Sequence, residues 1–131
     1  MKMLMLDVEN KDVKMVEANT LADYYRLIGC NYVDIIHRRI GDVEVEIVLD
    51  DEGLLVNAPK PSGIDVTGIP ILFGNLLIAS GRVTDDGELT ELTEEEVDEI
   101  MDNVATITTS VYTEPYPAFV EVDFKNYCHA T

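Results

Sequence analysis

The dipeptide formed by Gly41 and Asp42 separates two β-rich runs, and it is the sequence feature that most constrains the fold. Residues 32–40 precede it and residues 43–50 follow it, and both runs are rich in Ile and Val. A Gly-Asp pair suits a two-residue hairpin turn, which also sets the register of the two strands. The predicted opposite pairs are Ile40 with Val43, Arg39 with Glu44, His37 with Glu46, and Ile36 with Ile47. One face of the hairpin is then apolar, and the other carries opposite charges across the ladder.

Further β-rich segments predict a sheet around this hairpin. Residues 2–8 and 11–18 predict two paired strands, of which the first is central because its Met and Leu residues leave no polar face. Residues 69–73 and 75–80 predict strands that are buried on both faces, and residues 118–124 predict a last strand. Proline, glycine and serine between residues 61 and 68 predict a mobile loop.

Two segments carry helix signals. Residues 21–28 follow a cap at Asn19 or Thr20 and stop at Gly29. The second helix starts with Thr93 and Glu96 in a capping box, and it is expected to reach about Asn103. Residues 106–112 could continue the helix or form a strand, and the sequence does not decide between the two. Its apolar stripe consists of Val97, Ile100, Met101 and Val104.

The expected fold is therefore a single α+β domain over residues 1–131, with residues 125–131 frayed. Its core is a mostly antiparallel sheet of about six strands with two helices packed on it.

Charge limits the possible partners. The chain has 9 basic and 26 acidic residues among 131, a net charge of −17, of which −12 lies in residues 61–131. Such a chain repels nucleic-acid phosphate and anionic lipid, so we expect no direct nucleic-acid or membrane partner. No apolar run approaches the roughly 20 residues that cross a bilayer, and the first residues do not resemble a signal peptide. We expect a cytoplasmic protein whose partners are basic surfaces.

Motifs for metal, cofactor or catalytic chemistry are weak in this sequence. An EF-hand loop aligned on Gly87 or Gly53 would begin with Arg82 or Val48, neither of which ligates calcium. Cys30, Cys128, His37 and His129 lack zinc-site spacing, and no nucleophile elbow, phosphate loop or dinucleotide fingerprint occurs. We therefore expect no cofactor, no metal and no enzymatic activity.

The acidic second helix is the main candidate for function. Residues 85–102 contain ten carboxylates and one kind of charge only. Glu94, Glu95 and Glu96 fall in the first turn, where the helix dipole favours negative charge. On a helical wheel, the candidate interaction residues Glu95, Asp98, Glu99 and Asp102 form one row opposite the apolar stripe. Like charges three or four residues apart repel one another, so local stability does not explain this row. It is either a binding face or a face that only confers solubility.

Three segments resemble a family of small proteins from phages and mobile elements that carries the label domain of unknown function 3846. They read "IHRRIGDVEVEIVLDDEGLL", "GNLLIAS" and "LTEEEVDEI", and the resemblance covers about residues 31–100. The sequence departs from the family pattern after Val56, where Lys60, Pro61, Ser62 and Gly63 replace a helix-prone segment. Because the family has no assigned activity, the resemblance implies a genomic setting and no site residues.

Two functions remain open from the sequence. In the first, the protein is a non-enzymatic accessory protein of a phage or mobile element that binds a basic host protein through its acidic C-terminal half. A more specific form of this hypothesis is that the protein mimics DNA and thereby blocks a nuclease or another defence factor. In the second, it is a small-ligand or metal-binding domain, with the turn at residues 50–53 and the loop of the 60s at the mouth of a pocket.

Overall fold

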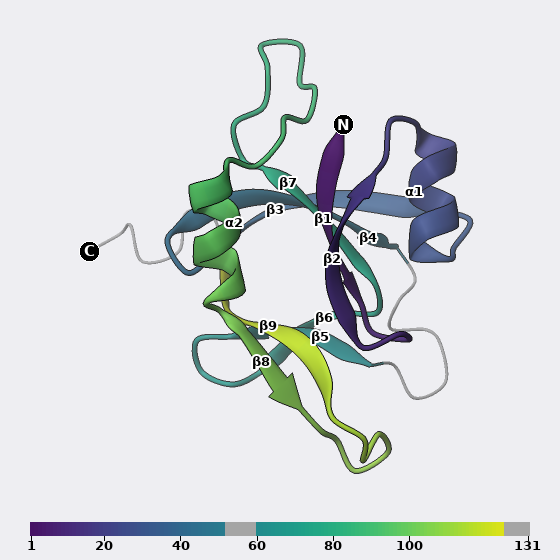
Figure 1. Cartoon of the computed structure of the whole chain (residues 1–131), viewed down its shortest axis with the longest axis vertical. Coiled ribbons are helices and arrows are strands. Elements are labelled where there is room, and N and C mark those ends of the chain that lie inside the picture. Colours follow the sequence, from purple (N-terminus) through teal and green to yellow (C-terminus); the bar gives the residue numbers. More distant parts are fainter. Residues whose placement is uncertain (52–59, 125–131) are drawn as a thin grey trace.

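The structure is a computed structural model that describes residues 1–51 and 60–124. Within these residues the chain forms nine strands and two helices, and Figure 1 shows them as one strongly curved sheet with α1 and α2 on different sides. The elements are β1 (Lys2–Asp7), β2 (Asp12–Glu17), α1 (Leu21–Ile28), β3 (Val33–Ile40), β4 (Val43–Asp50), β5 (Pro61–Asp65), β6 (Pro70–Phe73), β7 (Leu76–Ser80), α2 (Glu94–Met101), β8 (Val104–Ile107) and β9 (Tyr116–Phe124).

The hairpin of β3 and β4 has the predicted register. Ile40 pairs with Val43, Arg39 with Glu44, His37 with Glu46, and Ile36 with Ile47. Gly41 has a φ of 59°, in the left-handed region that a tight hairpin turn requires and that glycine adopts without strain. The hairpin and its register are therefore confirmed, and opposite charges do face each other across it, although Arg39 forms its ion pair with Asp123 of β9 at 3.4 Å.

Eight of the described strands follow the order β2-β1-β7-β4-β3-β9-β5-β6 in the sheet. The ninth strand, β8, is not part of this linear order and pairs with β9. The described pairings are antiparallel except that of β5 with β9. β1 lies between β2 and β7, which confirms its predicted central position. The α+β class and the mostly antiparallel sheet with two helices are also confirmed.

The predicted number of about six strands is too low: within the described residues the sheet has nine, and two of these come from segments without a clear strand signal. Residues 61–65 form β5, where the sequence predicted a mobile loop. Ser62 and Gly63 are buried, and a Cβ on Gly63 would lie 2.7 Å from Cδ1 of Leu72. This glycine therefore allows close approach of β5 and β6 and does not confer mobility. β8 covers residues 104–107, so only residues 106 and 107 of the open segment 106–112 are strand. Residues 69–73 were predicted to be buried on both faces, but β6, unlike β7, is only partly buried.

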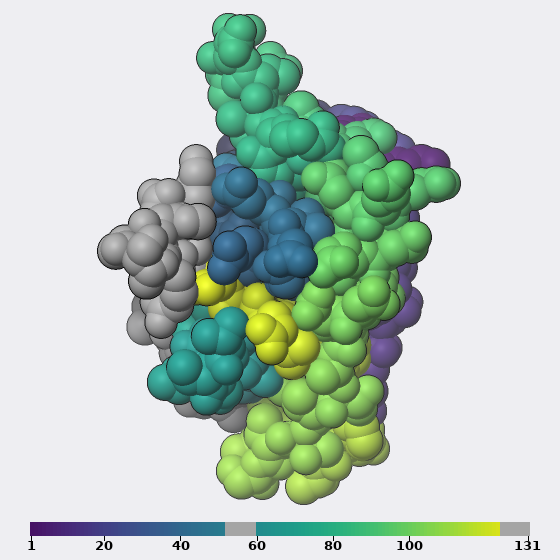
Figure 2. Space-filling model, turned by 90° about the vertical axis from the view of Figure 1, so that its left-hand side faces the viewer, coloured from purple at the N-terminus to yellow at the C-terminus, as the bar shows by residue number. Residues whose placement is uncertain are grey.

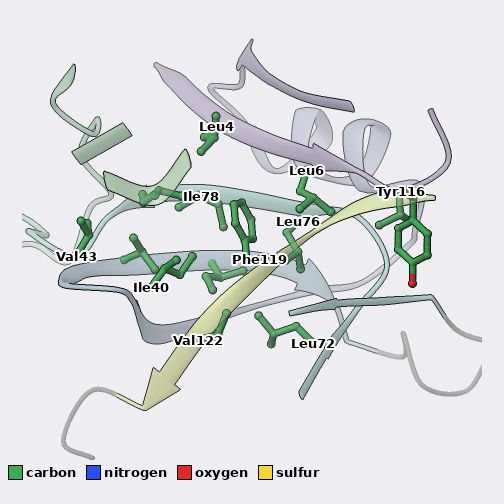
Figure 3. Close-up of a cluster of buried hydrophobic side chains, with 14 residues drawn as sticks. Leu4, Leu6, Ile40, Val43, Leu72, Leu76, Ile78, Tyr116, Phe119 and Val122 are labelled. Carbon is green, nitrogen blue, oxygen red and sulfur yellow. The ribbon is translucent and has the colours of Figure 1, made fainter. Parts of the chain in front are cut away.

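The main core lies on the concave face of the sheet. Figure 3 shows Leu4 and Leu6 of β1, Ile78 of β7, and Phe119 and Val122 of β9 directed toward one another. β1 and β9 are not neighbours in the strand order, so the sheet must curl around this cluster to bring their side chains together. Burial of such apolar side chains is the main driving force for this arrangement.

The two helices pack on opposite faces. α1 covers the convex face, where its Ile28 joins a second cluster that includes Met3 and Leu77, and α2 inserts Ile100 into the concave core. Of the two predicted cap candidates, Asn19 and Thr20, it is Thr20 that caps α1, and Gly29 ends the helix with a φ of 82°. In the described parts of the chain, no helix is long and apolar enough to cross a membrane.

Candidate functional site

The start of α2 is fixed by the predicted capping box. The Thr93 hydroxyl accepts a hydrogen bond from the Glu96 N–H at 3.1 Å, and the Glu96 carboxylate accepts one from the Thr93 N–H at 2.8 Å. The helix ends at Met101, slightly before the predicted end, with Asp102 as its C-cap. It ends there because residues 104–107 pair with β9 as β8, so β-branched residues follow the helix directly.

The C-terminal end of α2 is held at a junction of three elements. The N–H of Gly41 donates to the carbonyl of Glu121 at 3.1 Å, and the N–H of Val120 donates to the carbonyl of Asn103 at 2.7 Å. Asn103 also donates from Nδ2 to the carbonyl of Glu99. Glu121 has a φ of 58°, and at this point β9 changes its partner from β8 to β3. The junction fixes the direction in which α2 presents its outer face.

The four predicted interaction residues lie on this outer face. Glu95, Asp98 and Asp102 are exposed. Glu99 is only partly exposed, because its carboxylate lies beside Gly41 of the hairpin turn. The structure therefore places the predicted row on one side of α2 and turns one of its members toward the sheet. We call Glu95, Asp98, Glu99 and Asp102 the acidic row.

The acidic row has no cationic partner in the part of the chain that the structure describes. None of its four carboxylates takes part in an ion pair there. Asp102 stands at the C-terminal end of α2, where the helix dipole is negative and disfavours a carboxylate. The last turn contains no basic residue. The row is thus a concentration of like charge that the local structure does not compensate.

A projecting loop enlarges the acidic surface beside α2. Residues 82–88 are exposed and carry Asp85, Asp86 and Glu88. Figure 2 shows this loop as the lobe that rises from the top of the face on which α2 also lies. The turn of the loop is closed by the N–H of Gly87, which donates to the carbonyl of Thr84 at 2.9 Å. The sequence predicted this turn but not that it projects from the same face as α2.

One carboxylate of the acidic stretch has a cationic partner. Nη2 of Arg82 lies 2.6 Å from the Glu96 carboxylate and also donates to the carbonyl of Glu91. Partial burial acts to raise the pKa of Glu96, but the hydrogen bonds from Arg82 and from the Thr93 N–H outweigh it, and the pKa is lowered. Glu96 therefore serves to attach the base of the loop to α2.

The predicted apolar stripe of α2 is only partly covered. Ile100 is buried, Val97 is partly buried and Met101 is exposed, whereas Val104, the fourth predicted member, lies in β8 and not in α2. Beside Val97 lies a groove of about 540 Å³ between α2 and β2. It is lined by Lys2, Met15, Glu91, Leu92, Glu94, Val97 and Asp98. Sequence reasoning missed this groove, because its two walls are distant in the chain.

The alternative small-ligand site was predicted between the turn at residues 50–53 and the loop of the 60s. Residues 52 and 53 of the predicted turn lie outside the described residues, and residues 61–65 are a strand and not a loop. A smaller pocket of about 230 Å³ lies near Lys60 and is lined by Lys11, Lys60, Val111, Tyr112, Thr113, Glu114 and Tyr116. Nζ of Lys60 lies 4.6 Å from the centre of the Tyr112 ring, within cation–π distance.

Metal-ligand groups are not gathered in the described ranges 1–51 and 60–124. No set of three or more His, Cys, Asp or Glu side chains there is placed to hold an ion. His37 contacts Glu46 through Nδ1, as the hairpin register predicts, and its Nε2 lies 3.0 Å from the Glu44 carboxylate. Its surroundings are those of a histidine within a strand ladder.

Comparison with known proteins gives a family but no activity. No curated protein and no solved structure matches the chain. The family model described as "Domain of unknown function (DUF3846)" matches residues 1–105, which include β1, α1 and the acidic row as well as the segments that carried the resemblance. Because this match spans most of the 131 residues, the chain belongs to the DUF3846 family.

Proposed function

We propose that this protein is a non-enzymatic accessory protein of a phage or mobile element, and that it binds a basic host protein through the acidic row of α2. The observation that carries the proposal is the uncompensated charge of the row. Glu95, Asp98 and Asp102 are exposed and have no cationic partner among the described residues, and Asp102 opposes the helix dipole. A charge arrangement that local stability disfavours is expected where a partner supplies the opposite charge.

The sharper form of the proposal is a DNA mimic. Helix residues three or four positions apart have Cβ atoms about 5–6 Å from each other. This spacing is of the same order as the rise of about 3.4 Å per phosphate along a DNA strand. The exposed loop before α2 carries Asp85, Asp86 and Glu88, and it rises from the face on which α2 lies. A surface of this kind suits a groove that normally receives phosphates, such as that of a nuclease or another nucleic-acid-binding defence factor.

The proposal is tested by affinity capture from a host lysate at low and high salt. The test variant reverses Asp98, Glu99 and Asp102 to Lys. The control variant reverses Asp12, Asp34 and Asp51 to Lys, because these three exposed carboxylates lie on β2 and at the ends of β3 and β4 away from the hairpin turn. The proposal expects the control to retain a salt-sensitive partner that the test variant loses.

Two results would count against the proposal. Retention of the same partner by both variants would remove the acidic row from the interface. If duplex DNA does not compete with the protein for the captured partner, the partner is not held through a phosphate groove, and the mimicry form fails.

Small-ligand binding is the second candidate, and the pocket near Lys60 favours it. Lys11 and Lys60 line this pocket together with the edge-to-face pair of Tyr112 and Tyr116. The Lys11 ammonium pairs with Glu114, which also lines the pocket, and the Lys60 ammonium lies 3.5 Å from the Glu9 carboxylate, so a small anion would bind here by replacing these carboxylates. A higher melting temperature in millimolar citrate than in equal ionic strength of sodium chloride would support this function, and equal melting temperatures would oppose it.

A further inference from the structure

The groove between α2 and β2 has an apolar floor that the fold leaves uncovered. Met15 of β2 pairs with Leu4 of β1, so both side chains lie on the concave face of the sheet. Leu4 is 3% exposed, but Met15 is 45% exposed. α2 covers the core with Ile100, whereas Val97, one turn earlier, lines the groove. The groove lies between α2 and β2, and Figure 1 shows where these two elements stand in the fold.

The rim of the groove is acidic. Glu91, Glu94 and Asp98 line it, and Lys2 is the one cation among its lining residues. Glu91 is held in place because its carboxylate accepts a hydrogen bond from the Lys2 N–H at 2.8 Å. Glu94 and Asp98 are four residues apart on α2 and therefore lie on the same side of the helix. The groove thus combines an apolar floor with a pair of carboxylates, and both are accessible to a partner that binds the acidic row.

We propose that this groove receives an arginine side chain of the basic partner. The aliphatic part of the arginine would lie on Met15, Leu92 and Val97, and its guanidinium would contact Glu94 and Asp98. Long basic side chains bury their stems on apolar surface while their charged ends stay polar, and the guanidinium fork matches carboxylate geometry. The inference rests on the proposed function, and it names the side chain that anchors the partner.

Arginine fits the groove better than a shorter cation does. A short side chain carries its charge close to the backbone, so it can reach either the rim carboxylates or the apolar floor. Arginine reaches both at once. Buried arginine anchors also contribute strongly to many protein interfaces. The groove should therefore distinguish partners by the length of the cationic side chain and not by charge alone.

The test uses two defined peptides of equal charge. One is a fluorescein-labelled arginine-glycine repeat, and the other has every arginine replaced by 2,4-diaminobutyrate, whose cation has a shorter aliphatic stem. Binding to the full chain is measured by fluorescence anisotropy over a series of salt concentrations. The test variant is Met15→Ser, which changes the floor of the groove. The matched control is Met101→Ser, because Met101 is 41% exposed on α2 but does not line the groove.

The proposal expects the wild type to prefer the arginine peptide. Met15→Ser should weaken binding of that peptide about three- to tenfold, since the stem loses part of its apolar contact, and should reduce the preference over the diaminobutyrate peptide. Met101→Ser should bind both peptides as the wild type does. Melting curves must show that Met15→Ser is folded, and Met15→Leu, which keeps the apolar surface, should retain the preference.

Other results separate this inference from the proposed function. Equal binding of both peptides by the wild type, or wild-type binding by Met15→Ser, would overturn the arginine groove. If both peptides still bind in a salt-sensitive way that the reversal of Asp98, Glu99 and Asp102 abolishes, the acidic row stands without the groove. If neither peptide binds the wild type at low salt, both proposals fail.

Discussion

Arg82 lies 2.6 Å from the carboxylate of Glu96, and it joins the base of the projecting loop to the first turn of α2. This is the one ion pair that the carboxylates of residues 85–102 make within the described residues. The same guanidinium donates to the carbonyl of Glu91, which itself contacts β1. Arg82 therefore holds together the two parts of the acidic surface.

Replacing this arginine should destabilise the protein. Arg82→Gln removes the cation from Glu96 and leaves it among like charges, so the melting temperature at neutral pH should fall. Arg26→Gln is the control, because Arg26 pairs with Asp23 three residues away within α1 at 3.3 Å and joins no separate segments. Calorimetry should show a larger decrease for Arg82→Gln than for Arg26→Gln, and equal decreases would mean that Arg82 has no structural role beyond a surface pair.

The effect of Arg82→Gln should depend on pH. Burial acts to raise the pKa of Glu96 from its ordinary value of 4.5, but hydrogen bonds and the charge of Arg82 lower it overall. A carboxyl with a lowered pKa in the folded state contributes stability above its unfolded pKa and loses that contribution as the pH falls through its folded pKa. The difference in melting temperature between wild type and variant should thus be largest at neutral pH. It should decrease toward zero as the pH falls through the pKa of Glu96. A difference that stays constant into acid would show that Glu96 is not its cause.

The contact between the β3–β4 turn and the end of α2 can be tested at Gly41. A Cβ there would lie 2.5 Å from Nδ2 of Asn103 and 3.0 Å from the Glu99 carboxylate, and Gly41 has a φ of 59°. Gly87 has a φ of 81° with nothing within 4 Å of the same position, so Gly87→Ala reports the backbone strain alone. We expect Gly87→Ala to cost roughly 1–2 kcal/mol and Gly41→Ala to cost more. Urea denaturation measures both, and equal costs would show that α2 is not held by this contact.

The charge at the two ends of α2 should act in opposite directions on stability. Asp102→Asn removes a carboxylate from the negative end of the helix dipole and should stabilise the fold by about 0.3–1 kcal/mol. Glu94→Gln removes the same charge from the first turn and should destabilise it by a similar amount. Chemical denaturation at low ionic strength checks both signs. A loss of stability in Asp102→Asn would mean that local structure already compensates this charge.

Local signals predicted much of this fold. The turn at Gly41 predicted the register of β3 and β4, and Thr93 predicted the start of α2. The start of α1 was predicted to within one residue, at Asn19 or Thr20, because turns and caps depend on neighbouring residues. The error at Gly63 has a different origin. Its burial against Leu72 is a contact between strands, and the same glycine in isolation resembles a flexible loop.

The candidate site could be predicted only in part for the same reason. The acidic row follows from helical periodicity, and three of its members are exposed as expected. The inward turn of Glu99 depends on Gly41, and the groove depends on Met15, both of which are distant from α2 in the sequence. These features arise from the curvature of the sheet, which no local pattern encodes.

The most direct test of the acidic row is the salt dependence of binding to the captured partner. Two variants are compared with the wild type by titration over a range of salt concentrations. One neutralises Asp98, Glu99 and Asp102 with Asn or Gln, and the other neutralises Asp12, Asp34 and Asp51. If the row forms the interface, the first variant should bind more weakly and with a shallower dependence on salt, while the second should keep the slope of the wild type. Identical slopes for both variants would contradict the role of the acidic row.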